Sequence, residues 1–269
     1  MIRQPVVDGR FYEGTESGLK KQLSQLMLTK ENPRPAKALV VPHAGYMYSG
    51  WVAGETYASA TPAETYVILG PNHRGLGASL GIFSQGAWRT PLGLVPIDED
   101  IAANLLNSTD SLQPDVSAHQ YEHSLEVQVP FIQARTGSKA SIVPICVMIG
   151  GRDARVRELG DALAAAISAS EKSVCLVAST DLTHYRPQEV AKAQDEKAID
   201  AILALDVAGL VEVVEREGIS MCGVAPTAIA LVAAKALGAT RAEVIRYATS
   251  GDVTGDTSDV VGYVGVLID

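Results

Sequence analysis

Five histidines occur among the 269 residues, and four of them stand where an apolar run gives way to polar residues. His43 follows "ALVVP", His73 follows "YVILGPN" and His184 follows "CLVASTDLT", while His123 stands in "YEHSLE". A neutral imidazole is the commonest transition-metal ligand in proteins, so a metal site would account for this repeated placement. Taken one at a time, each histidine also fits a surface position or a hydrogen bond within its own loop.

A metal ion needs at least one further ligand, and two residues are candidates. Cys222 stands in "MCGVAP" ahead of a helix expected from about Ala225. The free N–H groups at a helix N-terminus stabilise a thiolate. Asp181 forms D-x-x-H with His184, so its carboxylate could bind the metal or orient the imidazole. The structural alternatives are a small residue in a tight turn for Cys222 and a turn cap for Asp181.

A zinc protease is a second interpretation of the histidines. The stretch from His119 to His123 matches H-x-x-E-H, in which both histidines bind zinc and Glu122 acts as the base. That arrangement requires a helix through His119, whereas "PDVSAHQYEHS" is more typical of a loop.

A thiol hydrolase is a third interpretation, because Cys222, His184 and Asp181 have the residue types of a nucleophile triad. Nothing in the sequence brings that thiol to that imidazole. "GPNHRGLG" lacks the spacing of a phosphate loop, and "ATSGDVTGDTSD" lacks the spacing of an EF-hand. We expect both to be structural or substrate-side loops.

The candidate residues can meet only if the elements that carry them end at one place. Apolar runs typical of buried strands, such as "ALVV", "YVILG", "IVPICVMIG" and "VCLVAS", alternate with helical patterns along most of the chain. This alternation predicts an α/β fold with a mixed, largely parallel central sheet and helices on both faces. Ligands of open α/β sheets bind beyond the carboxyl ends of the strands, where His43, His73 and His184 would lie.

Helical patterns separate these strands. An amphipathic helix is expected after Thr15, its N-cap. "WVAGETYASA" predicts a short helix or turn, and "LGIFSQGAWRTPLGLVPI" predicts a β-hairpin or meander. Further helices are expected from about Ser124, with a kink or break at Pro130, and on both sides of Asp206. No linker, repeat or low-complexity segment interrupts the sequence, so we expect one domain over residues 1–269.

Composition excludes several classes of function. The net charge of −9 disfavours nucleic-acid binding, which requires clustered Lys and Arg. No apolar run approaches the roughly 20 residues of a membrane helix, and "MIRQPVVDGRFYEG" lacks the apolar region of a signal peptide. Three cysteines without a C-x-x-C pair favour a reducing compartment. We expect a cytoplasmic protein that binds neither nucleic acid nor membrane.

Six motifs in order resemble the Memo family, whose prokaryotic members are called AmmeMemoRadiSam system protein B. They are "VPHAGYMYSG", "ILGPNHRG", "EHSLEVQVPF", "STDLTHY", "MCGVAPT" and "YATSGDVTGD". The family is similar to the class III extradiol dioxygenases, α/β enzymes that cleave catechol rings at a non-haem iron held by two histidines and a glutamate. The resemblance therefore implies a dioxygenase-like fold over nearly the whole chain.

The resemblance also implies roles for individual residues. By motif, His43 and His73 match the histidine ligands, and Cys222 takes the place of the glutamate. A thiolate is a softer ligand than a carboxylate, so it favours copper, zinc or a thiolate-tolerant iron site and casts doubt on simple ring cleavage.

The remaining candidates match residues that line the dioxygenase pocket. His123 and His184 correspond to pocket histidines, with His184 as the acid/base, and Asp181 is their neighbour. The expected function is metal-dependent redox chemistry on a small molecule, using one iron or copper ion, with zinc as an alternative. The name of the prokaryotic members implies radical-SAM and AMMECR-type partners. A non-catalytic module that binds a peptide or partner protein, and a metal- or thiol-dependent hydrolase, are the alternatives.

Overall fold

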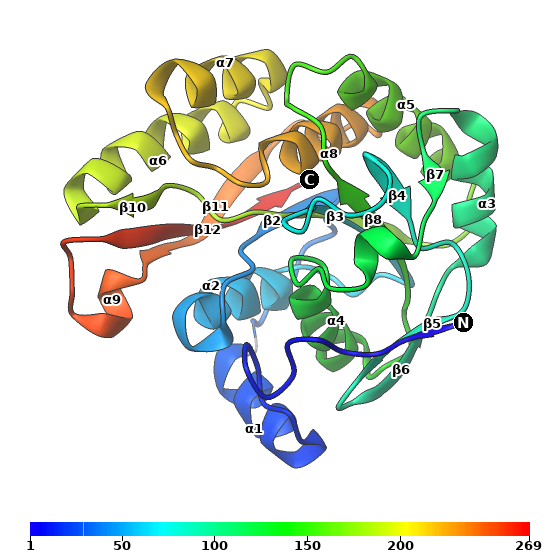
Figure 1. Ribbon diagram of the computed structural model, residues 1–269, viewed down its shortest axis with the longest axis horizontal. Coiled ribbons are helices and arrows are strands. Elements are labelled where there is room, and N and C mark those ends of the chain that lie inside the picture. Colours follow the sequence, from blue (N-terminus) through cyan, green and yellow to red (C-terminus); the bar gives the residue numbers. More distant parts are fainter. Residues whose placement is uncertain (29) are drawn as a thin grey trace.

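Within the described residues, 1–28 and 30–269, a computed structural model shows a nine-stranded mixed sheet (Figure 1). Its strands in spatial order are β10 (His184–Arg186), β12 (Val260–Ile268), β2 (Ala38–Val41), β9 (Val174–Ser179), β3 (Thr65–Pro71), β8 (Ser141–Val147), β4 (Leu80–Ile82) and β7 (Gln113–Pro114). The ninth strand, β11 (Ala242–Thr249), pairs with β12. The four central strands β2, β9, β3 and β8 are parallel. β12 runs antiparallel to its neighbours, and β4 runs antiparallel to β8 but parallel to β7. The prediction of a mixed, largely parallel sheet is confirmed.

Helices cover both faces of this sheet, as predicted (Figure 1). One face carries α3 (Glu99–Ser108), α5 (Arg155–Ser168), α6 (Gln188–Leu203), α7 (Val207–Glu217) and α8 (Val224–Ala236). The other face carries α1 (Glu16–Leu26), α2 (Tyr46–Ser59) and α4 (Val129–Thr136). The short α9 (Gly251–Thr254) lies between β11 and β12 in the chain. Because both cores share one sheet, the fold supports the one-domain organisation, which stays a prediction.

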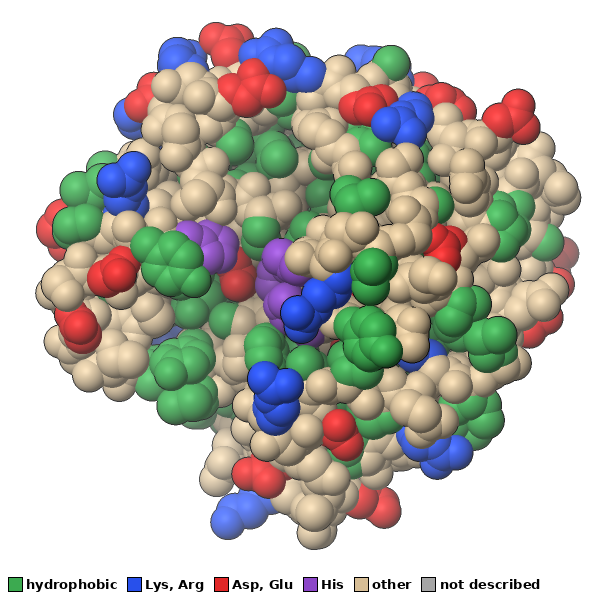
Figure 2. Space-filling view, viewed as in Figure 1, with side chains coloured by type: hydrophobic (Ala, Val, Ile, Leu, Met, Phe, Trp, Pro, Cys, Tyr) green, Lys and Arg blue, Asp and Glu red, His purple; other side chains and the backbone are tan. Residues whose placement is uncertain are grey.

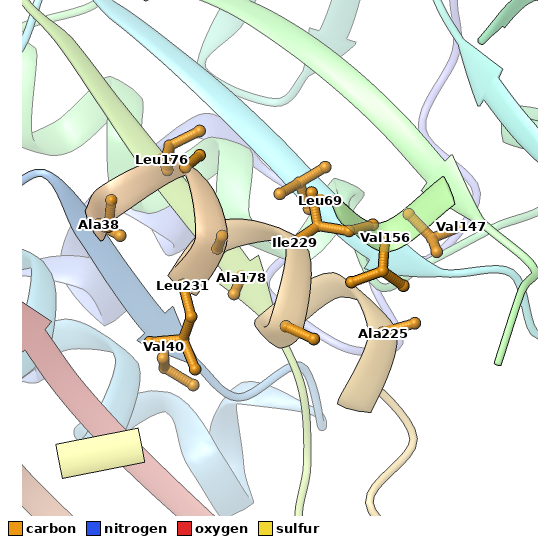
Figure 3. Close-up of a cluster of buried hydrophobic side chains, with 14 of the residues drawn as sticks. Ala38, Val40, Leu69, Val147, Val156, Leu176, Ala178, Ala225, Ile229 and Leu231 are labelled. Carbon is orange, nitrogen blue, oxygen red and sulfur yellow. The ribbon is translucent and has the colours of Figure 1, made fainter. Parts of the chain in front are cut away.

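The apolar runs are uninterrupted because both faces of each central strand are buried. In β2, Ala38 and Val40 belong to the core under α8, whereas Leu39 and Val41 belong to the core under α2. Figure 3 shows Leu231 of α8 packed beside Val40. This packing fixes β2, β9 and β3 against the helix that follows Cys222.

Several elements begin elsewhere than predicted. The predicted start of a helix at about Ser124 is wrong by several residues. A 3₁₀ turn, η2 (Glu126–Gln128), comes first, and α4 begins at Val129. Pro130 lies in the first turn of α4, where proline needs no N–H partner, so it neither kinks nor breaks the helix. The segment 80–97, predicted as a hairpin or meander, contributes to two sheets. β4 belongs to the main sheet, whereas β5 (Ala87–Thr90) and β6 (Gly93–Pro96) form a hairpin that pairs with β1 (Ile2–Arg3) in a second, three-stranded sheet.

Other local predictions are confirmed. The Thr15 hydroxyl accepts a hydrogen bond from the backbone N–H of Gly18 at 3.2 Å, so Thr15 caps α1. Asp206 separates α6 from α7 and caps the latter. The segment predicted as a short helix or turn belongs to α2, which has 14 residues. In the part of the chain that the structure describes, no helix is both long and apolar enough to cross a membrane.

Candidate metal centre

His43 and His73 leave the sheet at the same edge. His43 comes two residues after β2 and His73 two residues after β3, and these strands pair with opposite sides of β9. All three strands are parallel, so their carboxyl ends lie together. The centroids of the two imidazole rings are 5.2 Å apart.

Cys222 reaches this edge from the N-terminus of α8. A Cβ atom on Gly223 would lie 2.5 Å from the carbonyl oxygen of Ser179, so only glycine allows α8 to approach the end of β9 this closely. The backbone N–H of Gly223 donates to the Thr180 hydroxyl at 2.9 Å. Cys222 Sγ consequently lies 3.3 Å from Nε2 of His43. The candidate ligand atoms of His43, His73 and Cys222 are all within 4.8 Å of one another.

Ser179 determines the tautomer of His43. The single hydroxyl proton of Ser179 goes to the carbonyl oxygen of Ser124 at 2.7 Å, and Gln128 Nε2 donates to the Ser179 oxygen at 2.9 Å. The remaining contact, 2.9 Å from His43 Nδ1 to Ser179 Oγ, therefore requires Nδ1 to be the donor. Nε2 of His43 keeps its lone pair, and it faces the sulfur of Cys222.

Glu122 determines the tautomer of His73 in the same way. Its Oε1 accepts from His73 Nδ1 at 2.9 Å, and its Oε2 accepts from the backbone N–H of His73 at 2.6 Å. Burial alone would raise the pKa of Glu122, but the hydrogen bond and charge of His73 and the backbone N–H of Ser124 lower it to about 2. The carboxylate is ionised and can only accept, so Nδ1 donates and Nε2 of His73 keeps its lone pair.

These donors fit a soft or borderline transition-metal ion. Two imidazole lone pairs and one sulfur atom converge at the sheet edge, and both imidazoles are held by hydrogen bonds at Nδ1, as metal-binding histidines usually are. Burial and the charge of Asp181 raise the pKa of the Cys222 thiol to about 12. A cation that binds there would displace the thiol proton and form the thiolate.

His123 and Asp181 lie beside this group. The His123 ring stacks on His73 with centroids 4.7 Å apart, and its Nδ1 lies 3.3 Å from Glu122 Oε1. Burial and the charge of His43 lower the pKa of His123 to about 4. Asp181 Oδ1 accepts the backbone N–H of His43 at 2.8 Å, which fixes the loop that carries that ligand. Burial raises the pKa of Asp181.

His184 stands at the margin of the site. Its backbone N–H donates to Ser220 Oγ at 2.7 Å and its Nδ1 donates to the Ser220 carbonyl at 2.9 Å, which leaves a lone pair on Nε2. The pKa of His43 is lowered to about 3 by burial first and then by the charges of His73 and His184. Figure 2 shows histidine side chains (purple) around a hollow in this face.

The protease arrangement does not form. His119 ends the 3₁₀ turn η1 (Ser117–His119), is fully buried, and donates from Nε2 to the carbonyl of Gly81 at 3.0 Å. Among the described residues, candidate metal ligands gather in two groups, one of His43, His73 and Cys222 and one of His73, Glu122 and His123, and neither contains His119. Glu122 holds His73 instead of acting beside two zinc-binding histidines. The sequence-based hypothesis of an H-x-x-E-H site is therefore wrong.

The thiol triad does not form either. The Cys222 sulfur lies beside His43, whereas the ring of His184 is bonded to Ser220. The sequence alone does not predict the orienting role of three residues, Ser179, Gln128 and Glu122. The available signals were a serine that ends an otherwise apolar strand and a glutamate directly before His123, and neither signal reveals which ring it will hold.

Comparisons with known proteins show the family of the chain. Residues 3–267 match the family described as Memo-like protein. A MEMO1 family protein of Methanopyrus kandleri is 44% identical over 99% of both chains, and one of Methanosarcina barkeri is 42% identical over 100% of both chains. A MEMO1 family protein of Sulfurisphaera tokodaii is 43% identical over 99% of both chains.

One solved structure shares the fold. It is the crystal structure of an uncharacterized protein, JW3007, from Escherichia coli K12, with a TM-score of 0.59. The match covers 86% of this chain and 98% of the other at 15% sequence identity, so the likeness concerns the fold alone.

Proposed function

Since the chain belongs to the Memo-like protein family, we propose that it is a metal-binding protein whose His43, His73 and Cys222 hold one transition-metal ion. The observation that carries the proposal is the convergence of three ligand atoms within 4.8 Å, with both imidazoles fixed in the tautomer that leaves Nε2 free.

Iron or copper is the metal that we propose. A thiolate beside two imidazoles suits copper(I), zinc and thiolate-bound iron, and it suits magnesium or calcium poorly. Zinc has no redox chemistry and is the alternative. A redox-capable ion held by these three residues would supply electron transfer with a small molecule.

The surrounding residues would perform the remaining tasks. His184 would hold or move a proton at Nε2, because Nδ1 is committed to the carbonyl of Ser220. His123 and Asp181 would line the pocket, and Asp181 would keep the His43 backbone in place. We propose a dioxygenase-like oxidoreductase that works on a small molecule. Radical-SAM and AMMECR-type partners and a cytoplasmic location stay predictions from the resemblance and the composition.

Elemental analysis of anaerobically purified protein tests this function. We expect about one iron or copper per chain, and we expect His43→Ala and Cys222→Ala to lose it. Cys175→Ala is the matched control, because Cys175 is a buried core thiol outside the ligand group. Anaerobic loading with the metal should also raise the Tm of the wild type and of Cys175→Ala, but not that of Cys222→Ala.

Two results would overturn the proposal. One is a wild-type protein that contains no metal and takes up neither iron nor copper, which would favour a non-catalytic module that binds a peptide or partner protein. The other is full metal occupancy in both His43→Ala and Cys222→Ala, which would place any metal elsewhere. Circular dichroism of each variant separates loss of metal from loss of fold.

A further inference from the structure

A cavity of about 410 Å³ opens beside His123, and its lining has a distinctive chemistry. Its walls include two arginines and two aromatic side chains, namely Arg10, Arg74, Phe11 and Tyr121. Small-molecule sites commonly have such volumes and combine flat apolar walls with a few polar anchors. The cavity is therefore large enough for one ring and its substituents.

Both arginines are free to bind an anion. Among the described residues, no carboxylate lies within 4.0 Å of the guanidinium group of either Arg10 or Arg74. Arg74 donates from Nε to the carbonyl of Tyr121 at 3.1 Å, which fixes its orientation and leaves both Nη groups available. In a chain of net charge −9, two cations at one cavity without acidic partners indicate a site for an external oxyanion.

The N-terminal segment that carries Arg10 and Phe11 is held firmly in place. The buried carboxylate of Glu126 accepts the backbone N–H groups of Val6 and Val7 at 3.0–3.1 Å and the hydroxyl of Tyr12 at 2.8 Å. The Phe11 carbonyl also accepts the backbone N–H of Tyr46 at 2.7 Å. The wall of the cavity is thus organised before a ligand arrives, which lowers the entropic cost of binding.

The cavity adjoins the candidate metal centre through two rings. Phe11 and His123 have centroids 5.0 Å apart, and His123 in turn stacks on His73. Figure 2 shows basic side chains (blue) and large hydrophobic side chains (green) gathered next to the histidines on the same face. A flat molecule in the cavity would contact His123, which lines the cavity and stacks on His73 of the candidate metal centre.

We propose that this cavity binds a small organic anion, whose carboxylate or phosphate group pairs with Arg10 and Arg74 while its flat apolar body packs on Phe11 and Tyr121 toward His123. The proposal names the class of substrate for the metal centre, and in that respect it rests on the proposed function. Anion binding by the cavity itself requires only the residues that line it.

Fluorine NMR with 4-fluorobenzoate, 4-fluorophenyl phosphate and 4-fluorobenzamide tests the proposal. We expect one or both anions to bind and the neutral amide to bind about tenfold more weakly or not at all. Arg10→Gln and Arg74→Gln should each weaken anion binding about tenfold or more. Arg157→Gln is the matched control, because Arg157 is an exposed arginine of α5 outside the cavity, and it should bind like the wild type.

The outcomes separate this proposal from the metal function. The anion that binds more tightly shows whether the arginines prefer a carboxylate or a phosphate group. Three results would overturn the anion site. They are an affinity for the amide equal to that for the anions, an unchanged anion affinity in both Arg10→Gln and Arg74→Gln, and a loss of anion affinity in Arg157→Gln equal to that in the cavity variants. Metal analysis of Arg10→Gln and Arg74→Gln should show wild-type occupancy. If Cys222→Ala binds the anion normally while the wild type binds no metal, the anion site stands and the proposed metal function fails.

Discussion

Glu122 holds His73 by two hydrogen bonds, one to the imidazole Nδ1 at 2.9 Å and one to the backbone N–H at 2.6 Å. The same carboxylate accepts the backbone N–H groups of His123 and Ser124, both at 2.9 Å. One buried acid therefore fixes a ring, its loop and the neighbouring histidine. The position of His73 depends on the charge of Glu122 as well as on its shape.

Glu122→Gln should weaken metal binding by about 10- to 100-fold, the usual effect of losing an orienting partner of a metal-binding histidine. Glutamine has almost the same volume, but its NH₂ group is a donor that would face other donors in this cluster. Competition with a chelator under anaerobic conditions measures the affinity. An affinity equal to the wild type in a folded variant would show that Glu122 does not orient a ligand.

Ser179→Ala should affect both stability and metal binding. It removes the oxygen that accepts His43 Nδ1 and Gln128 Nε2 and leaves two buried donors without their partner, at a cost of about 1–3 kcal/mol. The freed imidazole should also bind metal more weakly. Urea unfolding of the metal-free protein measures the first effect, and chelator competition measures the second.

The control for this substitution is Ser24→Ala on the exposed face of α1, where the hydroxyl donates to the Lys21 carbonyl at 2.8 Å. It should change the free energy of unfolding by no more than about 0.5 kcal/mol. A similar decrease in the free energy of unfolding and in metal affinity in both serine variants would contradict the role given to Ser179.

The sheet could be predicted from sequence because its strands are buried on both faces and therefore read as continuous apolar runs. Val40 and Val41 point into different cores, yet both must be apolar. The start of α4 could not be predicted in the same way. The polar residues before it are bonded to distant partners, as Gln128 is to Ser179, so a 3₁₀ turn replaces the first turn of the expected helix.

The site was partly predictable for a similar reason. His43 and His73 follow apolar strands directly, so parallel pairing alone brings them to one edge. Cys222 was identified by its motif, but its distance to His43 depends on how closely α8 packs on β9. His119 and His123 both lie within three residues of Glu122 in the sequence. Only the tertiary structure shows that the His119 ring is buried while the His123 ring lines the pocket.

Gly223→Ala should displace the N-terminus of α8. The new Cβ would lie 2.5 Å from the Ser179 carbonyl, so the backbone must move, at a cost of about 1–3 kcal/mol in the free energy of unfolding. Movement of α8 carries Cys222 away from His43, so metal affinity should fall as well. Gly150→Ala is the matched control, because no atom of the described residues lies within 4 Å of its Cβ position. Equal changes in stability and metal affinity in the two variants would argue against the close approach of α8 to β9.

His119 is a buried histidine that should make stability depend on pH. Its Nε2 donates to the Gly81 carbonyl, and its Nδ1 has no partner among the residues that the structure describes. A proton on Nδ1 would add a buried donor and a charge near Arg3. Burial first, and then the charge of Arg3, lower the pKa of His119 to about 4.

The folded state consequently binds fewer protons at His119 than the unfolded state does between pH 6.5, the ordinary value for histidine, and pH 4. The stability that the neutral His119 ring contributes is therefore complete above about pH 6.5 and is lost as the pH falls through about 4. Its magnitude is on the order of 3 kcal/mol in the free energy of unfolding. His119→Asn removes the titrating group, so its free energy of unfolding in urea should decline less than that of the wild type between about pH 7 and pH 4.5. Parallel declines in the two proteins would mean that His119 is protonated as readily in the folded state as in the unfolded one.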